Sequence, residues 1–174
     1  MCHGAPDNFI YNEMCGHKYV LDPFDEFSRR PYIGLEHYRR AFEYTDAGIK
    51  EILSAHDIIV KEQHDLGKWT ALSVLAGCSR HRLNYLEQAT KWVEMFPELS
   101  QQACRHSHYG CNMFITTPAR YKAMMEDEFR YIQRMMETPN LQRSIVSYFC
   151  ETILTPYIIE KHNSKIFIGK VRMP

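Results

Sequence analysis

The segment Thr117–Met136, TPARYKAMMEDEFRYIQRMM, decides the fold that the sequence predicts. Threonine can cap a helix, and proline suits the first turn because its missing N–H needs no partner there. After this start, apolar side chains recur at the spacing of one helix face, and charged side chains fill the opposite face. The apolar face comprises Tyr121, Met125, Phe129, Ile132 and Met136. The segment therefore predicts an amphipathic helix that packs against other helices.

The same helical spacing extends over most of the chain. A long helix is predicted between Asp65, its candidate cap, and Pro97, which ends it. Two more pairs, Thr138-Pro139 and Thr155-Pro156, predict further helix starts, and residues 166–171 predict a short extended tail. We therefore expect an all-α protein, a single bundle of about five to seven helices.

The first 34 residues lack this periodicity and contain several prolines and glycines. They predict an extended, aromatic-rich arm over 1–34. A helical domain is predicted to follow over 35–174, and within it Ile59 and Val60 continue an apolar helix face. Aromatic side chains give a large contact area at low entropy cost, so the arm is expected to bind a partner. The candidate partner-binding residues are Tyr11, Tyr19, Phe24, Phe27 and Tyr32.

Composition narrows the classes of function. The chain has 174 residues, and 21 basic side chains balance 21 acidic ones, so no overall field favours nucleic acid. No apolar run approaches the roughly 18 residues of a membrane span, and no basic region followed by an apolar run indicates a secretory signal. We expect an intracellular protein, in the cytoplasm or in an organelle, whose six cysteines are free thiols.

The densest chemistry lies in Ala103–Cys111, ACRHSHYGC. If residues 104–108 are extended, Cys104, His106 and His108 share one face, and a turn could return Cys111 as the fourth ligand of a structural zinc ion. If the segment is helical, Cys104, His108 and Cys111 align, and a fourth ligand must come from elsewhere, such as Cys78 or His81. A third reading has buried cysteines beside histidines at a helix end. Zinc is a possible cofactor, and no other is expected.

Motifs of catalysis are absent. The sequence has no phosphate loop, glycine-rich dinucleotide turn, Gly-x-Ser-x-Gly elbow or His-Glu-x-x-His. Cys78 and His81 would share a helix face, but an activated thiol also needs a third group and a cleft. These absences weigh against an enzyme, although a catalytic site need not carry a local motif.

One stretch invites comparison with a known family. Thr155-Pro156-Tyr157-Ile158-Ile159, followed by His162-Asn163, loosely resembles the C-terminal homology motif of B-cell-lymphoma-type apoptosis regulators. His108-Tyr109-Gly110 lies where that family has Asn-Trp-Gly-Arg, with Cys111 in place of the arginine. Pro118 falls inside what would be the family's central helix. The resemblance implies a helical bundle that binds a partner helix.

Together these observations predict a non-catalytic helical interaction module, an accessory or structural subunit of a larger assembly whose partners are other protein subunits. The first alternative is a zinc-stabilised helical domain that uses Cys104, His106, His108 and Cys111. The second is an apoptosis-regulator-like bundle.

Overall fold

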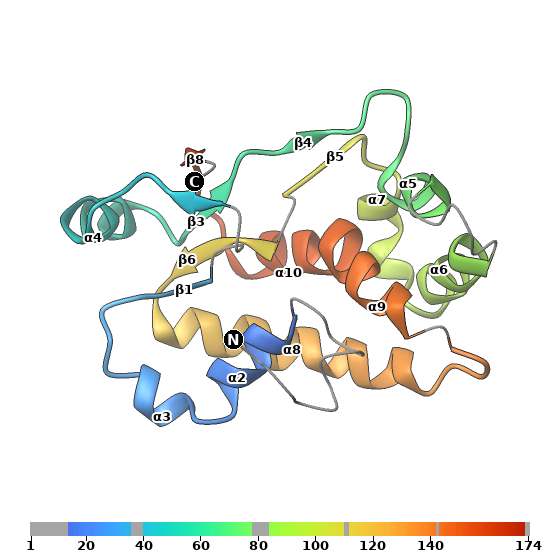
Figure 1. Ribbon diagram of the computed structural model, residues 1–174, viewed down its shortest axis with the longest axis horizontal. Helices are drawn as coiled ribbons and strands as arrows, with labels where there is room; N and C mark the ends of the chain where they lie inside the picture. The colour runs from blue at the N-terminus through green and yellow to red at the C-terminus, as the bar shows by residue number, and fades with distance from the viewer. Residues whose placement is uncertain (1–13, 36–39, 78–83, 110–111, 142, 173–174) are drawn as a thin grey trace.

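The computed structural model describes residues 14–35, 40–77, 84–109, 112–141 and 143–172. At its centre lies a four-stranded mixed sheet in the order β1-β6-β3-β7, of which Figure 1 labels β1, β6 and β3. β3 pairs parallel with β7, and β6 pairs antiparallel with both β3 and β1. The strands are β1 (Ile33–Leu35), β3 (Ile58–Lys61), β6 (Phe114–Thr116) and β7 (Ile166–Gly169).

The all-α prediction is therefore wrong, and the protein has a mixed α/β fold. Ile59 and Val60, which were expected to continue a helix face, lie in β3 and are fully buried together with Ile58. A strand that is buried on both faces shows no alternation of apolar and polar residues. Its short apolar run cannot be told from a buried helix segment by periodicity.

Helices cover the sheet on both faces (Figure 1). Ile58 and Val60 belong to one core with residues of α8 and α10, whereas Ile59 packs with Ile49 of α4 in a second cluster. α8 confirms the helix predicted at Thr117-Pro118. The helices are α2 (Met14–Leu21), α3 (Phe24–Phe27), α4 (Asp46–Ala55), α5 (Ala71–Gly77), α6 (Asn84–Met95), η1 (Pro97–Leu99), α7 (Ser100–Ala103), α8 (Pro118–Met136), α9 (Ser144–Phe149), η3 (Cys150–Leu154, a π-helical segment) and α10 (Thr155–His162).

The predicted arm forms regular structure where it is described. α2 and α3 are helical, and α2 packs on α8 through a contact between His17 and Tyr121. The expected boundary after residue 34 falls inside β1, whose register pairs Gly34 with Ile115. Residues 14–35 thus contribute two helices and a strand to the α/β fold.

Two short ribbons extend the architecture: β2 (Ala41–Phe42) with β8 (Val171–Arg172), and β4 (His64–Asp65) with β5 (Ser107–His108). Asp65, the expected helix cap, lies in β4 and accepts the Gly67 N–H at 2.8 Å. The helix that follows begins instead at α5, where Thr70 Oγ1 accepts the Ser73 N–H. The extended tail is confirmed, and it forms β7 and β8.

In the part of the chain that the structure describes, no helix is both long and apolar enough to cross a membrane.

Candidate functional site

The carboxyl ends of β1, β3 and β7 lie at the same end of the sheet, where β6 begins. We call this end of the sheet the carboxyl edge. Open α/β sheets bind their ligands in the crevice outside the carboxyl ends of their strands. Val60 pairs with Phe114, so Lys61 and Asn112 lie at neighbouring strand ends. The β4–β5 ribbon brings His108 close enough for the Lys61 charge to lower its pKa. We call Lys61, His108 and Asn112 the edge cluster.

Asn112 is the least satisfied residue of the edge cluster. Only 4% of it is exposed, and neither its Oδ1 nor its Nδ2 has a hydrogen-bond partner among the described residues. Each buried polar group without a partner costs about 1–3 kcal/mol. Its φ of 48° is also in the left-handed region, which non-glycine residues seldom adopt. Groups of this kind concentrate at functional sites.

His17 fixes the backbone at Asn112. The imidazole is 1% exposed, stacks on Phe114 at a centroid distance of 5.2 Å, and donates to the Asn112 carbonyl. Its Nδ1 lies 3.2 Å from the Tyr121 hydroxyl. Burial lowers the pKa of His17 to about 4, so the ring is neutral at pH 7. α2 and α8 therefore hold the start of β6 in place.

His108 brings a second unpartnered group to the same edge. It is 6% exposed, and its Nδ1 has no partner among the described residues, while its other ring nitrogen donates to the Glu151 carbonyl. Burial lowers the pKa of His108, with smaller contributions from the charges of His64 and Lys61, and Glu151 opposes the shift. The neutral ring thus keeps a free lone pair on Nδ1.

Lys61 supplies positive charge. Lys61 is only 8% exposed, and its side chain forms no ion pair with any residue that the structure describes. A lysine of this kind can bind a phosphate as a compact cation. The edge cluster therefore combines a cation, an amide with both a donor and an acceptor, and an imidazole lone pair. This set suits a ligand that carries phosphate and hydroxyl groups.

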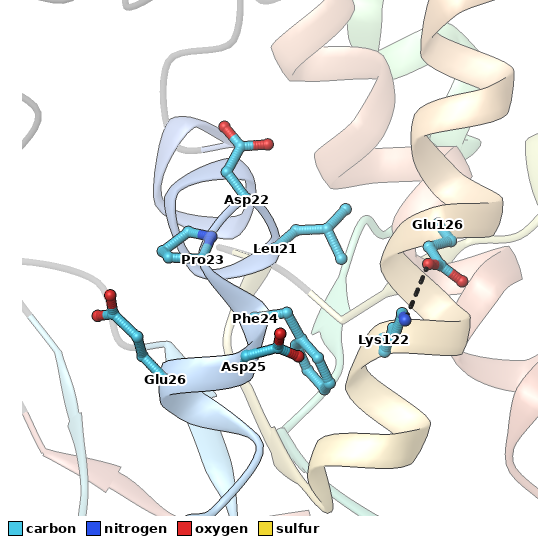
Figure 2. Close-up of a pocket in the computed structure, with 8 residues that line it drawn as sticks. All are labelled: Leu21, Asp22, Pro23, Phe24, Asp25, Glu26, Lys122 and Glu126. Atoms are coloured by element: carbon cyan, nitrogen blue, oxygen red, sulfur yellow. Dashed lines mark ion pairs between the residues drawn. The ribbon is translucent and has the colours of Figure 1, made fainter.

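A pocket of about 430 Å³ lies elsewhere, between the α2–α3 turn and α8 (Figure 2). Lys122 pairs with Glu126 at 3.7 Å and lies 5.4 Å from the centroid of the Phe24 ring. The carboxylates of Asp25 and Glu26 on its rim are exposed. None of the buried, unpartnered atoms of the described residues belongs to this pocket, so it has less need of a ligand than the edge cluster.

The predicted zinc ligands are only partly described. Cys104 is exposed at the end of α7, His106 is exposed beside the Gly67 carbonyl, and His108 is buried in β5. The segment is thus a helix end followed by a strand. The described residues contain no group of three His, Cys, Asp or Glu side chains that could hold a metal ion. Cys111 lies outside them, as do Cys78 and His81, so the four-ligand set stays a prediction.

The predicted partner-binding aromatics are spread over several environments. Tyr19 is 65% exposed and meets Phe27 edge-on at 6.4 Å. Phe24 and Phe27 are half-buried against the main core, and the Tyr32 hydroxyl donates to Asp46. Tyr11 lies outside the described residues. Their role in partner binding stays a prediction.

The sequence interpretation did not single out Lys61, Asn112 or His17. One signal was available for Asn112, because asparagine tolerates positive φ and here stands two residues after Gly110, directly before an apolar run. No local pattern marks His17, whose contacts lie about 100 residues away along the chain.

Comparisons with known proteins give a family and a fold. Residues 5–163 match the model of a family described as a domain of unknown function (DUF4422), and no curated protein matches. A solved structure titled "WbbM bifunctional glycosyltransferase apo structure" is similar to 96% of this chain with a TM-score of 0.72 and 14% identity. This chain spans 37% of that one. At this identity the similarity shows a common fold alone.

The predicted non-catalytic helical interaction module, an accessory subunit of a larger assembly, is overturned by this finding. The fold is a mixed α/β fold, similar to that of a chain titled as a glycosyltransferase, and not a helical bundle. A zinc-stabilised helical domain and an apoptosis-regulator-like bundle fail for the same reason, because both require an all-helical chain.

Proposed function

The chain belongs to the family described as a domain of unknown function (DUF4422), and we propose that it is a glycosyltransferase domain, which moves a sugar from a phosphate-linked donor to a hydroxyl group. Fold alone does not assign an activity, so the proposal depends on the site. The observation that carries it is the edge cluster, in which His108 Nδ1 and both amide atoms of the Asn112 side chain are buried without hydrogen-bond partners near Lys61. The likeness to a glycosyltransferase chain supports it.

The edge cluster suits the chemistry of glycosyl transfer. A hydroxyl oxygen of the acceptor bonds to the anomeric carbon, the bond from that carbon to the phosphate oxygen breaks, and the hydroxyl proton passes to Nδ1 of His108. Lys61 would stabilise the negative charge that grows on the departing phosphate. The Nδ1 lone pair of His108 would accept a hydrogen bond from the attacking hydroxyl. The amide of Asn112 would bind further hydroxyl groups.

The proposal is tested by turnover of the full chain with a panel of nucleoside-diphosphate sugars, with and without sugar acceptors. We expect release of nucleoside diphosphate from at least one donor. Lys61→Met, which keeps the apolar stem but removes the charge, should lower this rate by about tenfold or more. Lys165→Met is the matched control, because Lys165 precedes β7 at the opposite edge of the sheet. Failure to turn over any donor, or equal rates for Lys61→Met and wild type, would refute the proposal.

A further inference from the structure

The side-chain amide of Asn112 restricts what its ligand can be. Nδ2 is a hydrogen-bond donor and Oδ1 an acceptor, and both are buried without partners. A phosphate or a carboxylate offers only acceptors, and an ammonium group offers only donors, so each would leave one end of the amide unsatisfied. Hydroxyl groups both donate and accept. Two neighbouring hydroxyls therefore satisfy both ends of the amide at once.

The backbone that carries this amide is held in place before any ligand binds. The His17 ring holds the Asn112 carbonyl, and Tyr121 and Phe114 hold the ring in turn. A group that is fixed in advance loses little conformational entropy when a ligand binds. The positive φ of Asn112 is not by itself a sign of function, because Asn140 has a φ of 57° in an exposed turn. The two residues differ in burial, because the Asn140 side chain is exposed to solvent whereas the unpartnered amide of Asn112 is buried.

We propose that Asn112 binds, through both ends of its side-chain amide, two neighbouring hydroxyl groups of the sugar that is transferred. This inference rests on the proposed glycosyl transfer and adds the residue that distinguishes a sugar-bearing donor from its bare nucleotide. Both amide atoms are shielded from solvent, so the surrounding chain moves when the sugar reaches them.

The experiment measures the affinity of two ligand pairs by titration calorimetry: UDP-glucose with UDP, and GDP-mannose with GDP. Wild type should bind the sugar-bearing member of one pair about tenfold more tightly than its bare nucleotide. Asn112→Gly removes the amide, and glycine adopts a φ of 48° without strain. This variant should lose the tenfold preference and bind the bare nucleotide within about twofold of wild type. Asn140→Gly, the matched control, should keep the preference.

The possible outcomes separate this inference from the proposed function. An equal loss of affinity for both members of a pair would place Asn112 on the nucleotide and overturn the inference, as would an unchanged preference. In either case the proposed glycosyl transfer would stand. If wild type binds neither pair and turns over no donor in the panel, both proposals fail. Should Asn112→Gly not fold, Asn112→Asp retains the acceptor but loses the N–H donor, and it should also lose the preference.

Discussion

Glu128 places a carboxyl group in the core, and its titration should limit stability at high pH. The side chain is fully buried on α8. Thr155 Oγ1 donates to its Oε1 at 2.5 Å, and its Oε2 has no partner among the described residues. Burial raises the pKa of Glu128 to about 8, the Thr155 hydrogen bond opposes this shift, and the charge of Asp127 adds to it. At neutral pH the folded protein thus carries a protonated Glu128.

The sign and size of the effect follow from this pKa. The unfolded chain releases the Glu128 proton near pH 4.5, whereas the folded protein retains it to about pH 8. The contribution of Glu128 to stability is therefore fully present below pH 4.5 and is lost as the pH rises through 8. The contribution of Glu128 to the free energy of unfolding should fall by about 1.4 kcal/mol per pH unit in this window. Between about pH 5 and about pH 7.5 the loss is about 3 kcal/mol.

Urea unfolding of wild type and Glu128→Gln at several pH values measures this loss. Glutamine has the same shape but does not ionise, so the free energy of unfolding of the variant relative to wild type should grow by about 1.4 kcal/mol per pH unit. Glu126→Gln is the matched control, because Glu126 is exposed on the same helix. The stability of that variant should remain parallel to wild type across the range.

His17 titrates in the opposite direction, which is why the comparison between variants is needed. Burial lowers the pKa of His17 to about 4, so its contribution to stability is present above pH 6.5 and is lost as the pH falls toward 4. In wild type the two slopes cancel between about pH 4.5 and about pH 6.5. Glu128→Gln should expose the His17 slope alone. A constant difference between Glu128→Gln and wild type from about pH 5 to about pH 7.5 would refute the reasoning, because Glu128 would then titrate alike in both states.

Two further predictions concern packing and the support of the site. A Cβ added at Gly169 would lie 2.9 Å from Ile59 Cγ2, so Gly169→Ala should destabilise the protein by about 1–3 kcal/mol in urea unfolding. Gly48→Ala, whose nearest neighbour would be 3.5 Å away inside α4, should instead stabilise it by up to about 1 kcal/mol. His17→Phe keeps the stacking on Phe114 but loses both polar contacts, and it should weaken binding of the sugar-bearing donor in calorimetry. His17→Gln, which retains a donor, should recover part of that affinity, and equal affinities of the two variants would contradict a positioning role.

The sequence predicted α8 well because a helix with one buried face carries its own periodic signal. β3 carries none, because Ile58, Ile59 and Val60 are all buried. Their pairing partners in β6, such as Thr116 opposite Ile58, lie far away in the sequence. A three- or four-residue strand gains its stability from such distant pairings, so its sequence alone resembles a fragment of a buried helix. This difference explains why helices were predicted where strands form.

The site was less predictable for a related reason. The cysteines and histidines of Cys104–Cys111 lie in one stretch of sequence, so their spacing predicts a site there. Asn112 is marked by a side-chain amide that has no hydrogen-bond partner among the described residues. Its backbone carbonyl is held by His17, which lies on α2, about 100 residues earlier in the sequence. Neither property is local, so composition and spacing do not report them.

The distribution of unsatisfied groups supports the position of the site independently of the fold comparison. In the described part of the chain, the buried side-chain atoms without a hydrogen-bond partner are His108 Nδ1, Asn112 Nδ2, Asn112 Oδ1, Glu128 Oε2 and Asn163 Oδ1. Three of these atoms belong to His108 and Asn112 at the carboxyl edge. Apolar replacements would remove their desolvation cost, which is about 1–3 kcal/mol for each group. A ligand that bonds to these atoms offsets the same cost, and sugar hydroxyls can satisfy all three because the imidazole and Oδ1 accept while Nδ2 donates.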